Sequence, residues 1–318
     1  MSDAIEPSET KPEGPLRRGW TTGACAAAAT RAAYEALVTG ACPDPVEVSL
    51  PGGARPSFAV ASFETFDNGA TAGIVKDAGD DPDVTHGALV KASVRPGAPG
   101  SGVCFVAGEG VGTVTKAGLP IPPGEPAINP VPREMMRAAV REVTERFGAS
   151  GDVVVEISIP GGEALAAKTL NGRLGIIGGL SILGTTGIVI PYSCAAWIHS
   201  IHRGIDVARA SGVAHIAGST GSTSEVAVQR LHSLPEASLI DMGDFVGGML
   251  KYAKRHPVPR ITIAGGFAKM TKLGQGLLDL HSRAGSVDNA WLSELLREAE
   301  APRDLVELSR SANTALQV

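Results

Sequence analysis

The stretch LRRGWTTGACAAAA (residues 16–29) contributes most to a prediction of this fold. A Thr-Thr-Gly turn stands directly before a run of small helix-forming residues, so Thr21 or Thr22 is expected to cap a helix over residues 21–38 that stops at Gly40. The backbone N–H groups at such a helix start can hold a carboxylate or a phosphate. The alternative interpretation of this sequence is an ordinary helix N-cap packed through small side chains.

Composition narrows the class of protein. The 318 residues are 43% hydrophobic and 19% charged, which indicates a globular chain long enough for two domains. Forty glycines beside 4% aromatic residues favour an enzyme with many tight turns around a ligand. A net charge of −5 argues against a nucleic-acid partner and requires local arginines for an anionic substrate.

The cysteines, the two chain ends and one uncharged stretch indicate the cellular setting of the protein. Four scattered cysteines without a CxxC pair support neither a zinc site nor an iron–sulfur cluster, and they favour a reducing cytoplasm. Residues 1–15 are expected to form a flexible tail, and residues 291–318 a C-terminal helical tail. The stretch 174–201 lacks charges, but its glycines and Pro191 favour a buried strand and loop over a membrane span.

The periodicity predicts two kinds of domain. Residues 16–150 are expected to form an α+β domain with a mostly antiparallel or mixed sheet and a second helix over 132–147. Residues 151–290 are expected to form a Rossmann-like parallel α/β domain that begins with strand 153–159. The later strands are expected at 213–218, 238–243 and 260–265, and the helices at 193–211, 224–234, 245–254 and 267–281.

Six segments are runs of Gly, Thr and Asp with few large side chains. They are residues 16–29, VKDAGDDPDVTHGA (75–88), GEGVGTVTKAG (108–118), PGEPAINPVPR (123–133), LNGRLGIIGGLSILGTTGIVIPYS (170–193) and MGDFVG (242–247). In this order they resemble the CbiD-type cobalt-precorrin-5B C1-methyltransferases of anaerobic cobalamin biosynthesis, from about Leu16 to about Asp288. The resemblance implies methyl transfer from S-adenosyl-L-methionine to C1 of a cobalt-tetrapyrrole, without a membrane or nucleic-acid partner and with a possible homo-oligomer.

Glycine-rich loops at the carboxyl ends of parallel strands are the expected donor site. The turn 218–223 suits the methionine carboxylate, and Glu225, Asp241 or Asp244 the ribose hydroxyls. Plain turn chemistry is the alternative for each loop. The residues expected at the donor are Gly184, Thr185, Thr186, Gly187, Gly218, Ser219, Thr220, Gly221, Glu225 and Asp244.

The first domain is expected to supply much of the pocket for the macrocycle. The acidic stretch 77–86 is expected either to be a solvated turn or to face the substrate. Its close oxygen ligands could also bind Mg²⁺ or Ca²⁺, although its proline and the missing EF-hand spacing argue against a metal loop. Asp81, His86 and Glu109 are the catalytic candidates. Carboxylate arms of the ring need cationic forks or helix starts. The expected substrate-binding residues are Thr21, Thr22, Gly23, Lys76, Asn129, Arg133 and Arg173.

Two other functions fit the loops. A phosphate- or nucleotide-binding small-molecule enzyme would use the same helix starts, although the sequence has no GxxxxGK[ST] motif. A non-catalytic tetrapyrrole-binding protein is the third hypothesis.

Overall fold

The computed structural model describes residues 14–312 and residue 317, which form two compact units. The first unit runs through Thr113 and includes Gly124–Asn171 and Ile176–Tyr192. The second contains Val114–Pro123, Gly172–Gly175 and the residues from Ser193 onward. Most of the predicted tail 1–15 lies outside the described residues.

A five-stranded mixed sheet is the centre of the first unit. Its strand order is β4-β5-β6-β9-β7, and only the β7–β9 pair is parallel. The strands are β4 (Ser62–Phe66), β5 (Gly69–Val75), β6 (Leu89–Pro96), β7 (Val103–Ala107) and β9 (Val153–Ser158). A tight turn joins β4 to β5, where Asn68 has a φ of +58° before Gly69. The predicted mixed sheet is confirmed.

Strand β9 belongs to the first unit, although it follows the domain boundary expected after residue 150. It pairs with β6 and β7 inside the first unit, which continues to Tyr192. The side chains of β9 alternate between buried and more exposed, so one face of the strand packs into the core of the first unit. The prediction that 153–159 opens the parallel domain is therefore wrong.

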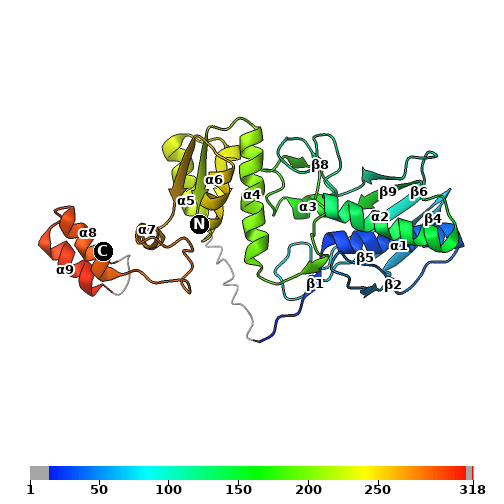
Figure 1. The fold of residues 1–318 in the computed structure, drawn as a ribbon, viewed down its shortest axis with the longest axis horizontal. Helices are drawn as coiled ribbons and strands as arrows, with labels where there is room; N and C mark the ends of the chain where they lie inside the picture. Colours follow the sequence, from blue (N-terminus) through cyan, green and yellow to red (C-terminus); the bar gives the residue numbers. More distant parts are fainter. Residues whose placement is uncertain (1–13, 313–316, 318) are drawn as a thin grey trace. The chain divides into compact units, whose positions relative to one another are not determined.

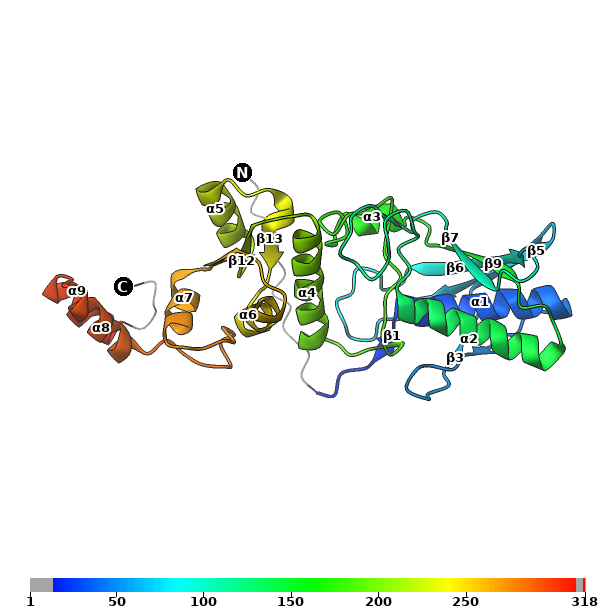
Figure 2. The ribbon, with the colours of Figure 1, turned by 45° about the horizontal axis from the view of Figure 1, so that its top comes forward.

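Two long helices, α1 (Thr22–Thr39) and α2 (Pro130–Phe147), lie side by side along the first unit's sheet (Figures 1 and 2). Helix α1 is buried around most of its circumference, because it packs against both the sheet and α2. Its alanines from Ala26 to Ala29 have no exposed surface, and small side chains allow this close approach on all sides. Gly40 ends α1 and Gly148 ends α2, each with a positive φ.

Short elements complete the first unit. Strand β1 (Gly19–Trp20) pairs antiparallel with β11 (Ile188–Val189), and β2 (Val46–Glu47) pairs antiparallel with β3 (Ser57–Phe58). Helix α3 covers Gly162–Ala166, and β8 (Thr113–Val114) and β10 (Ile176–Ile177) have two residues each. The β1–β11 pair brings the segment before α1 next to residues that follow it by more than 160 positions.

Three parallel strands form the sheet of the second unit, in the order β13-β12-β14. The strands are β12 (His215–Ser219), β13 (Leu239–Asp241) and β14 (Arg260–Ala264). The helices are α4 (Cys194–Ala210), α5 (Ser222–His232), the 3₁₀ turn η1 (Glu236–Ser238), α6 (Val246–Arg255), α7 (Phe267–Gly274), α8 (Asn289–Glu298) and α9 (Arg303–Ser311). The expected alternation of parallel strands and helices is present. The last expected helix ends at Gly274 instead of residue 281.

No helix among the described residues is long and apolar enough to cross a membrane. The uncharged stretch 174–201 instead contains two short strands, turns and the first part of α4.

Candidate functional site

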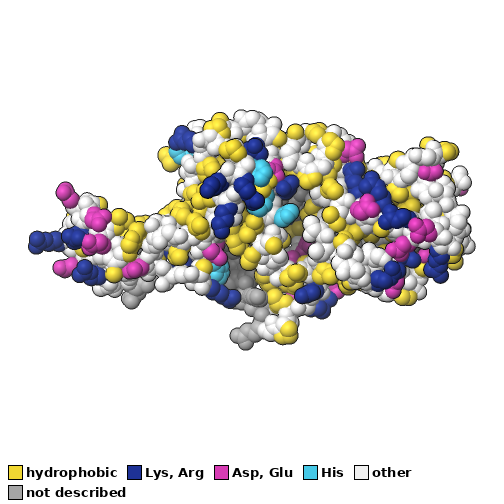
Figure 3. Space-filling model, viewed as in Figure 1, with side chains coloured by type: hydrophobic (Ala, Val, Ile, Leu, Met, Phe, Trp, Pro, Cys, Tyr) yellow, Lys and Arg dark blue, Asp and Glu magenta, His cyan; other side chains and the backbone are white. Residues whose placement is uncertain are grey.

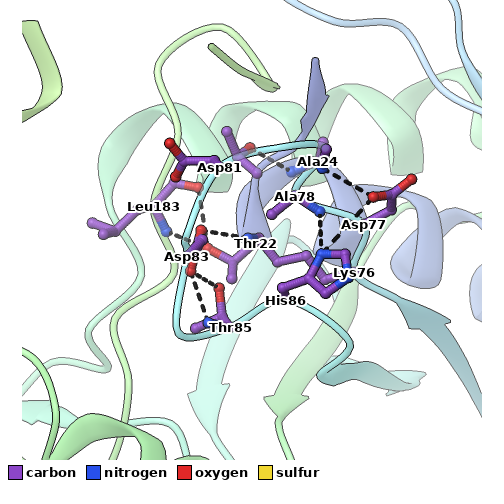
Figure 4. Close-up of polar contacts among 12 residues, drawn as sticks. Thr22, Ala24, Lys76, Asp77, Ala78, Asp81, Asp83, Thr85, His86 and Leu183 are labelled. Atoms are coloured by element: carbon purple, nitrogen blue, oxygen red, sulfur yellow. Dashed lines mark hydrogen bonds and ion pairs between the residues drawn. The ribbon is translucent and has the colours of Figure 1, made fainter. Parts of the chain in front are cut away.

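The loop 76–87 holds a buried ion pair beside the start of α1 (Figure 4). The Lys76 side chain is 1% exposed, and its Nζ lies 2.5 Å from Asp83 Oδ2. The other Asp83 oxygen accepts hydrogen bonds from the Thr85 backbone N–H at 2.7 Å and from the Thr85 hydroxyl at 2.6 Å. Burial acts to raise the pKa of Asp83, but Lys76 and the Thr85 donors outweigh it and lower that pKa. Lys76, expected to bind substrate, is thus neutralised within the chain.

The start of α1 is occupied by the chain itself. The Gly23 N–H donates to the Leu183 carbonyl at 2.8 Å, and the Ala24 N–H donates to Thr21 Oγ1 at 3.2 Å. The Thr22 hydroxyl accepts from the Leu183 N–H at 2.9 Å. The expectation that this start offers open N–H groups to an anion is therefore wrong for Gly23 and Ala24, because the Leu183 carbonyl takes the first N–H and the Thr21 cap takes the second.

The loop that covers α1 contains the first group of expected donor residues. Gly184 and Gly187 have φ values of +130° and +82°. A Cβ at Gly184 would overlap Thr21 Oγ1, and one at Gly187 would lie 2.6 Å from Leu50. These glycines are thus needed for packing, whereas Thr185 and Thr186 between them are exposed.

His86 is an exposed titratable side chain of the 76–87 loop (Figure 4). Its Nδ1 accepts the Ala78 N–H at 3.1 Å, so the neutral ring carries its proton on Nε2. Its side chain is 54% exposed. In this tautomer His86 can donate a hydrogen bond from Nε2 but cannot accept a proton there. This favours a role for His86 as a hydrogen-bond donor to a substrate over a role as a general base.

Arg17 forms a two-pronged ion pair with Asp77 next to His86. This bonding, followed by the Gly79 N–H, lowers the pKa of Asp77 to about 2. The Arg17 backbone N–H also donates to Asp80 at 2.6 Å. The Arg17–Asp77 pair ties the segment before α1 to the 76–87 loop.

Asp81 and Glu109, the other catalytic candidates, do not join His86 in one hydrogen-bonded group. Asp81 Oδ1 accepts the Tyr192 N–H at 2.8 Å and supports a residue whose φ is +56°. Glu109 lies on an exposed turn after β7, and within residues 14–312 its carboxylate has no hydrogen bond or ion pair.

Asn129 and Arg133 brace the entry to α2. The Asn129 amide donates to the Ile182 carbonyl at 3.2 Å. Arg133 donates to the carbonyls of Ile128 at 2.8 Å and Pro126 at 3.0 Å, and it pairs with Glu125. The expected cationic fork of Arg133 is thus engaged by the loop that precedes its own helix.

The carboxyl ends of β12, β13 and β14 hold the second group of expected donor residues. The turn after β12 places Thr220 and Gly221 before α5, whose start has no side-chain cap. A Cβ built at Gly221 or Gly266 meets no atom within 4 Å, so both turns border open space. This edge offers backbone N–H groups to a ligand.

The three acidic residues of this edge differ in their partners. Glu225 accepts two hydrogen bonds from Arg173, at 2.7 and 2.8 Å. A residue expected to bind the tetrapyrrole substrate therefore binds a residue expected to bind the methyl donor. Asp244 Oδ1 lies 3.0 Å from Lys269 Nζ. Asp241 has no ion pair within residues 14–312, and burial, against the Gly243 N–H, raises its pKa.

A stack of rings joins α4 to α6 in the second unit. The rings of His202 and Tyr252 lie 3.8 Å apart, and those of Tyr252 and His256 lie 4.0 Å apart. The Tyr252 hydroxyl donates to Asp206 at 2.8 Å. Lys, Arg and His side chains gather on the surface over these helices (Figure 3). Burial, followed by the charge of His199, lowers the pKa of His202, which fits a packed ring.

Most of the expected site residues therefore fall into two groups, one in each unit, and Glu109, Asn129 and Arg133 belong to neither. Thr21–Gly23, Lys76, Asp81, His86 and Gly184–Gly187 meet at the start of α1. Arg173, Glu225, Asp244 and the 218–221 turn meet at the parallel strands. Within the described part of the chain, no group of three His, Cys, Asp or Glu side chains is placed to hold a metal ion.

Comparisons with known proteins agree on one family. The family model described as CbiD matches residues 9–191. A protein of Bradyrhizobium sp. named cobalt-precorrin-5B C(1)-methyltransferase is 71% identical over 96% of this chain and 81% of its own length. A protein of the same name from Methylorubrum extorquens is 64% identical over 96% of this chain and 84% of its own length.

One solved structure is also similar. It is the cobalamin biosynthesis protein cbiD from Archaeoglobus fulgidus, with 29% identity, 91% coverage of this chain, 86% coverage of that chain and a TM-score of 0.46.

Proposed function

The chain belongs to the CbiD family, and from this premise we propose that it methylates C1 of cobalt-precorrin-5B with S-adenosyl-L-methionine as the donor. The observation that carries this proposal is the identity of 71% over 96% of the chain with a relative of that name. The cobalt belongs to the substrate.

The donor fits the carboxyl ends of the strands in the second unit. The uncapped start of α5 offers N–H groups for the methionine carboxylate, and the turn at Gly221 borders open space. Arg173 neutralises Glu225 in the first turn of α5, so a ligand carboxylate meets less repulsion there. Gly218, Ser219 and Thr220 shape this turn. The donor supplies an activated methyl group, whose bond to sulfur breaks as its bond to the ring carbon forms.

The protein's own contribution is binding, alignment and the exclusion of water. For the macrocycle we infer contacts with the exposed edge of the 76–87 loop, where His86 Nε2–H can donate to a substrate carboxylate or carbonyl. The exposed hydroxyls of Thr185 and Thr186 border the same region of the first unit. Lys76, Asn129 and Arg133 support these loops through their bonds within the chain.

The test is anaerobic incubation of cobalt-precorrin-5B with the full chain and methyl-labelled S-adenosylmethionine, followed by mass spectrometry. We expect the tetrapyrrole to gain one labelled methyl group and S-adenosylhomocysteine to appear in equal amount. A changed visible spectrum of the tetrapyrrole without label transfer would indicate a binding protein instead. The absence of both label transfer and a spectral change would refute the proposal.

His86→Gln is the matched variant, because glutamine retains a hydrogen-bond donor near the same reach. We expect it to keep most of the activity, whereas His86→Ala raises KM. If His86→Gln lowered kcat by a larger factor than it raised KM, His86 would have a proton-transfer role. That result would contradict its role as a hydrogen-bond donor.

A further inference from the structure

Trp197 places an exposed indole beside the turn that follows β13. It lies in the first turn of α4, and its side chain is among the exposed large hydrophobic groups at 46%. A Cβ built at Gly243 would lie 3.4 Å from three atoms of this ring, so the Gly243 backbone borders the indole. Gly243 also has a φ of +51°, which favours glycine at this position.

Asp241 ends β13 two residues before that glycine. In the sheet register it lies opposite Ser219, the last residue of β12, from which the 220–221 turn begins. The neighbouring acids are engaged, Glu225 by Arg173 and Asp244 by Lys269. Among the described acids of this edge, Asp241 is therefore the one without an ion pair, and its carboxylate can accept hydrogen bonds from a ligand.

The order of these parts suits a nucleoside. A strand, a glycine turn, a helix and a second parallel strand that ends in an acid place that acid beside the turn, where it can accept a ribose diol. A flat aromatic ring next to the acid offers a stacking surface for a base, and such stacking does not depend on the identity of the base. An amino-acid ligand alone would leave the indole without a partner.

We propose that Trp197 stacks on the adenine of the methyl donor and that Asp241 accepts hydrogen bonds from its ribose hydroxyls. This inference rests on the proposed use of S-adenosylmethionine. It assigns the adenosine half of the donor to β13 and α4, and it leaves the methionine half at the turn before α5.

Fluorescence and calorimetry on the full chain test the assignment. The chain has three tryptophans, Trp20, Trp197 and Trp291. S-adenosylhomocysteine is expected to quench the emission of the wild type and of Trp291→Phe, and to leave that of Trp197→Phe nearly unchanged. Loss of stacking is expected to weaken binding by about tenfold in Trp197→Leu.

Asp241→Asn is the second variant, and Glu298→Gln is its matched control, because Glu298 is exposed at the end of α8. We expect Asp241→Asn to weaken S-adenosylhomocysteine about tenfold and Glu298→Gln to have no effect. 5′-Methylthioadenosine separates the two halves of the ligand. The variants at Trp197 and Asp241 should weaken it by the same factor as S-adenosylhomocysteine.

Unchanged affinity in both variants would overturn the assignment, as would loss of S-adenosylhomocysteine binding with normal 5′-methylthioadenosine binding. A wild-type chain that binds neither ligand and transfers no methyl group would instead refute the proposed function. The two failures are therefore distinguishable.

Discussion

Replacement of Asp83 by alanine tests the role of the buried ion pair in the first unit. The change leaves the Lys76 ammonium, 1% exposed in its side chain, without its counter-ion. Removal of one partner from a buried pair costs about 3–5 kcal/mol of unfolding free energy. Because the Asp83 side chain is 25% exposed and water can reach its place, we expect the lower end, about 3 kcal/mol.

Lys76→Met is the matched change from the other side of the pair. Asp83 then keeps both hydrogen bonds from Thr85 and its partial exposure, and the methionine fills the space of the lysine stem. We expect a smaller loss, about 1–2 kcal/mol. The double variant should lose less than the sum of the two, with a coupling of about 1–3 kcal/mol.

Urea unfolding followed by Trp20 fluorescence measures these losses. The backbone N–H of Trp20 donates to the Asp77 backbone carbonyl at 2.7 Å, so this residue reports on the loop that holds the Lys76–Asp83 pair. A background of Trp197→Phe and Trp291→Phe isolates its signal, which matters because two units need not unfold together. If Asp83→Ala were no more destabilising than Lys76→Met, the buried ammonium would not be the costly group and the reasoning would fail.

The pH dependence supplies an independent check. The pKa of Asp83 is lower in the folded chain than its usual value near 3.9, so its stabilisation is present above about pH 4. That stabilisation is lost as the pH falls through the folded pKa. The difference in stability between wild type and Asp83→Asn should therefore shrink below about pH 4 and stay constant between about pH 6 and 8.

Three further predictions concern other residues. Gly79→Ala should cost about 2–5 kcal/mol, because its φ is +69° and a Cβ would overlap the backbone before α1, whereas Gly87→Ala, with φ +76° and open space, should cost only about 1 kcal/mol in the same urea assay. Arg133→Met should lower stability by about 1–3 kcal/mol and leave KM for the tetrapyrrole within about twofold, since its guanidinium bonds to the chain; a large rise in KM without lost stability would restore its substrate role. Burial raises the pKa of Cys25 to about 12, so peptide mass spectrometry after iodoacetamide at about pH 8 should find Cys104 modified and Cys25 unmodified until the chain unfolds.

Local features of the fold follow well from the sequence. The Thr-Thr-Gly turn and Gly40 mark the bounds of α1 within a residue, and Gly148 marks the end of α2, because caps depend on near neighbours. The alternation of short strands and helices after residue 212 predicts the parallel strands β12, β13 and β14. The family motifs, read from the letters alone, indicate the same family as the comparisons.

The candidate site was harder to predict. The sequence identifies candidate residues by the chemistry of their side chains. In the structure, many of the polar atoms of these side chains bond within the chain, as with Lys76 and Asp83 or Arg173 and Glu225. The last pair joins residues 52 positions apart, and no local pattern announces it. Trp197 was missed because its neighbour Gly243 comes close only through the packing of α4 near the end of β13.

The sequence by itself determined both ends of α1 to within a residue and the end of α2, since capping acts over a few residues. Only the tertiary structure decided that β9 joins the first sheet and that Leu183 takes the N–H of Gly23. Both outcomes depend on hydrogen-bonding groups that must find partners once they are buried, and the partner may be anywhere in the chain. Long-range pairing therefore selected which polar groups remain available to a ligand.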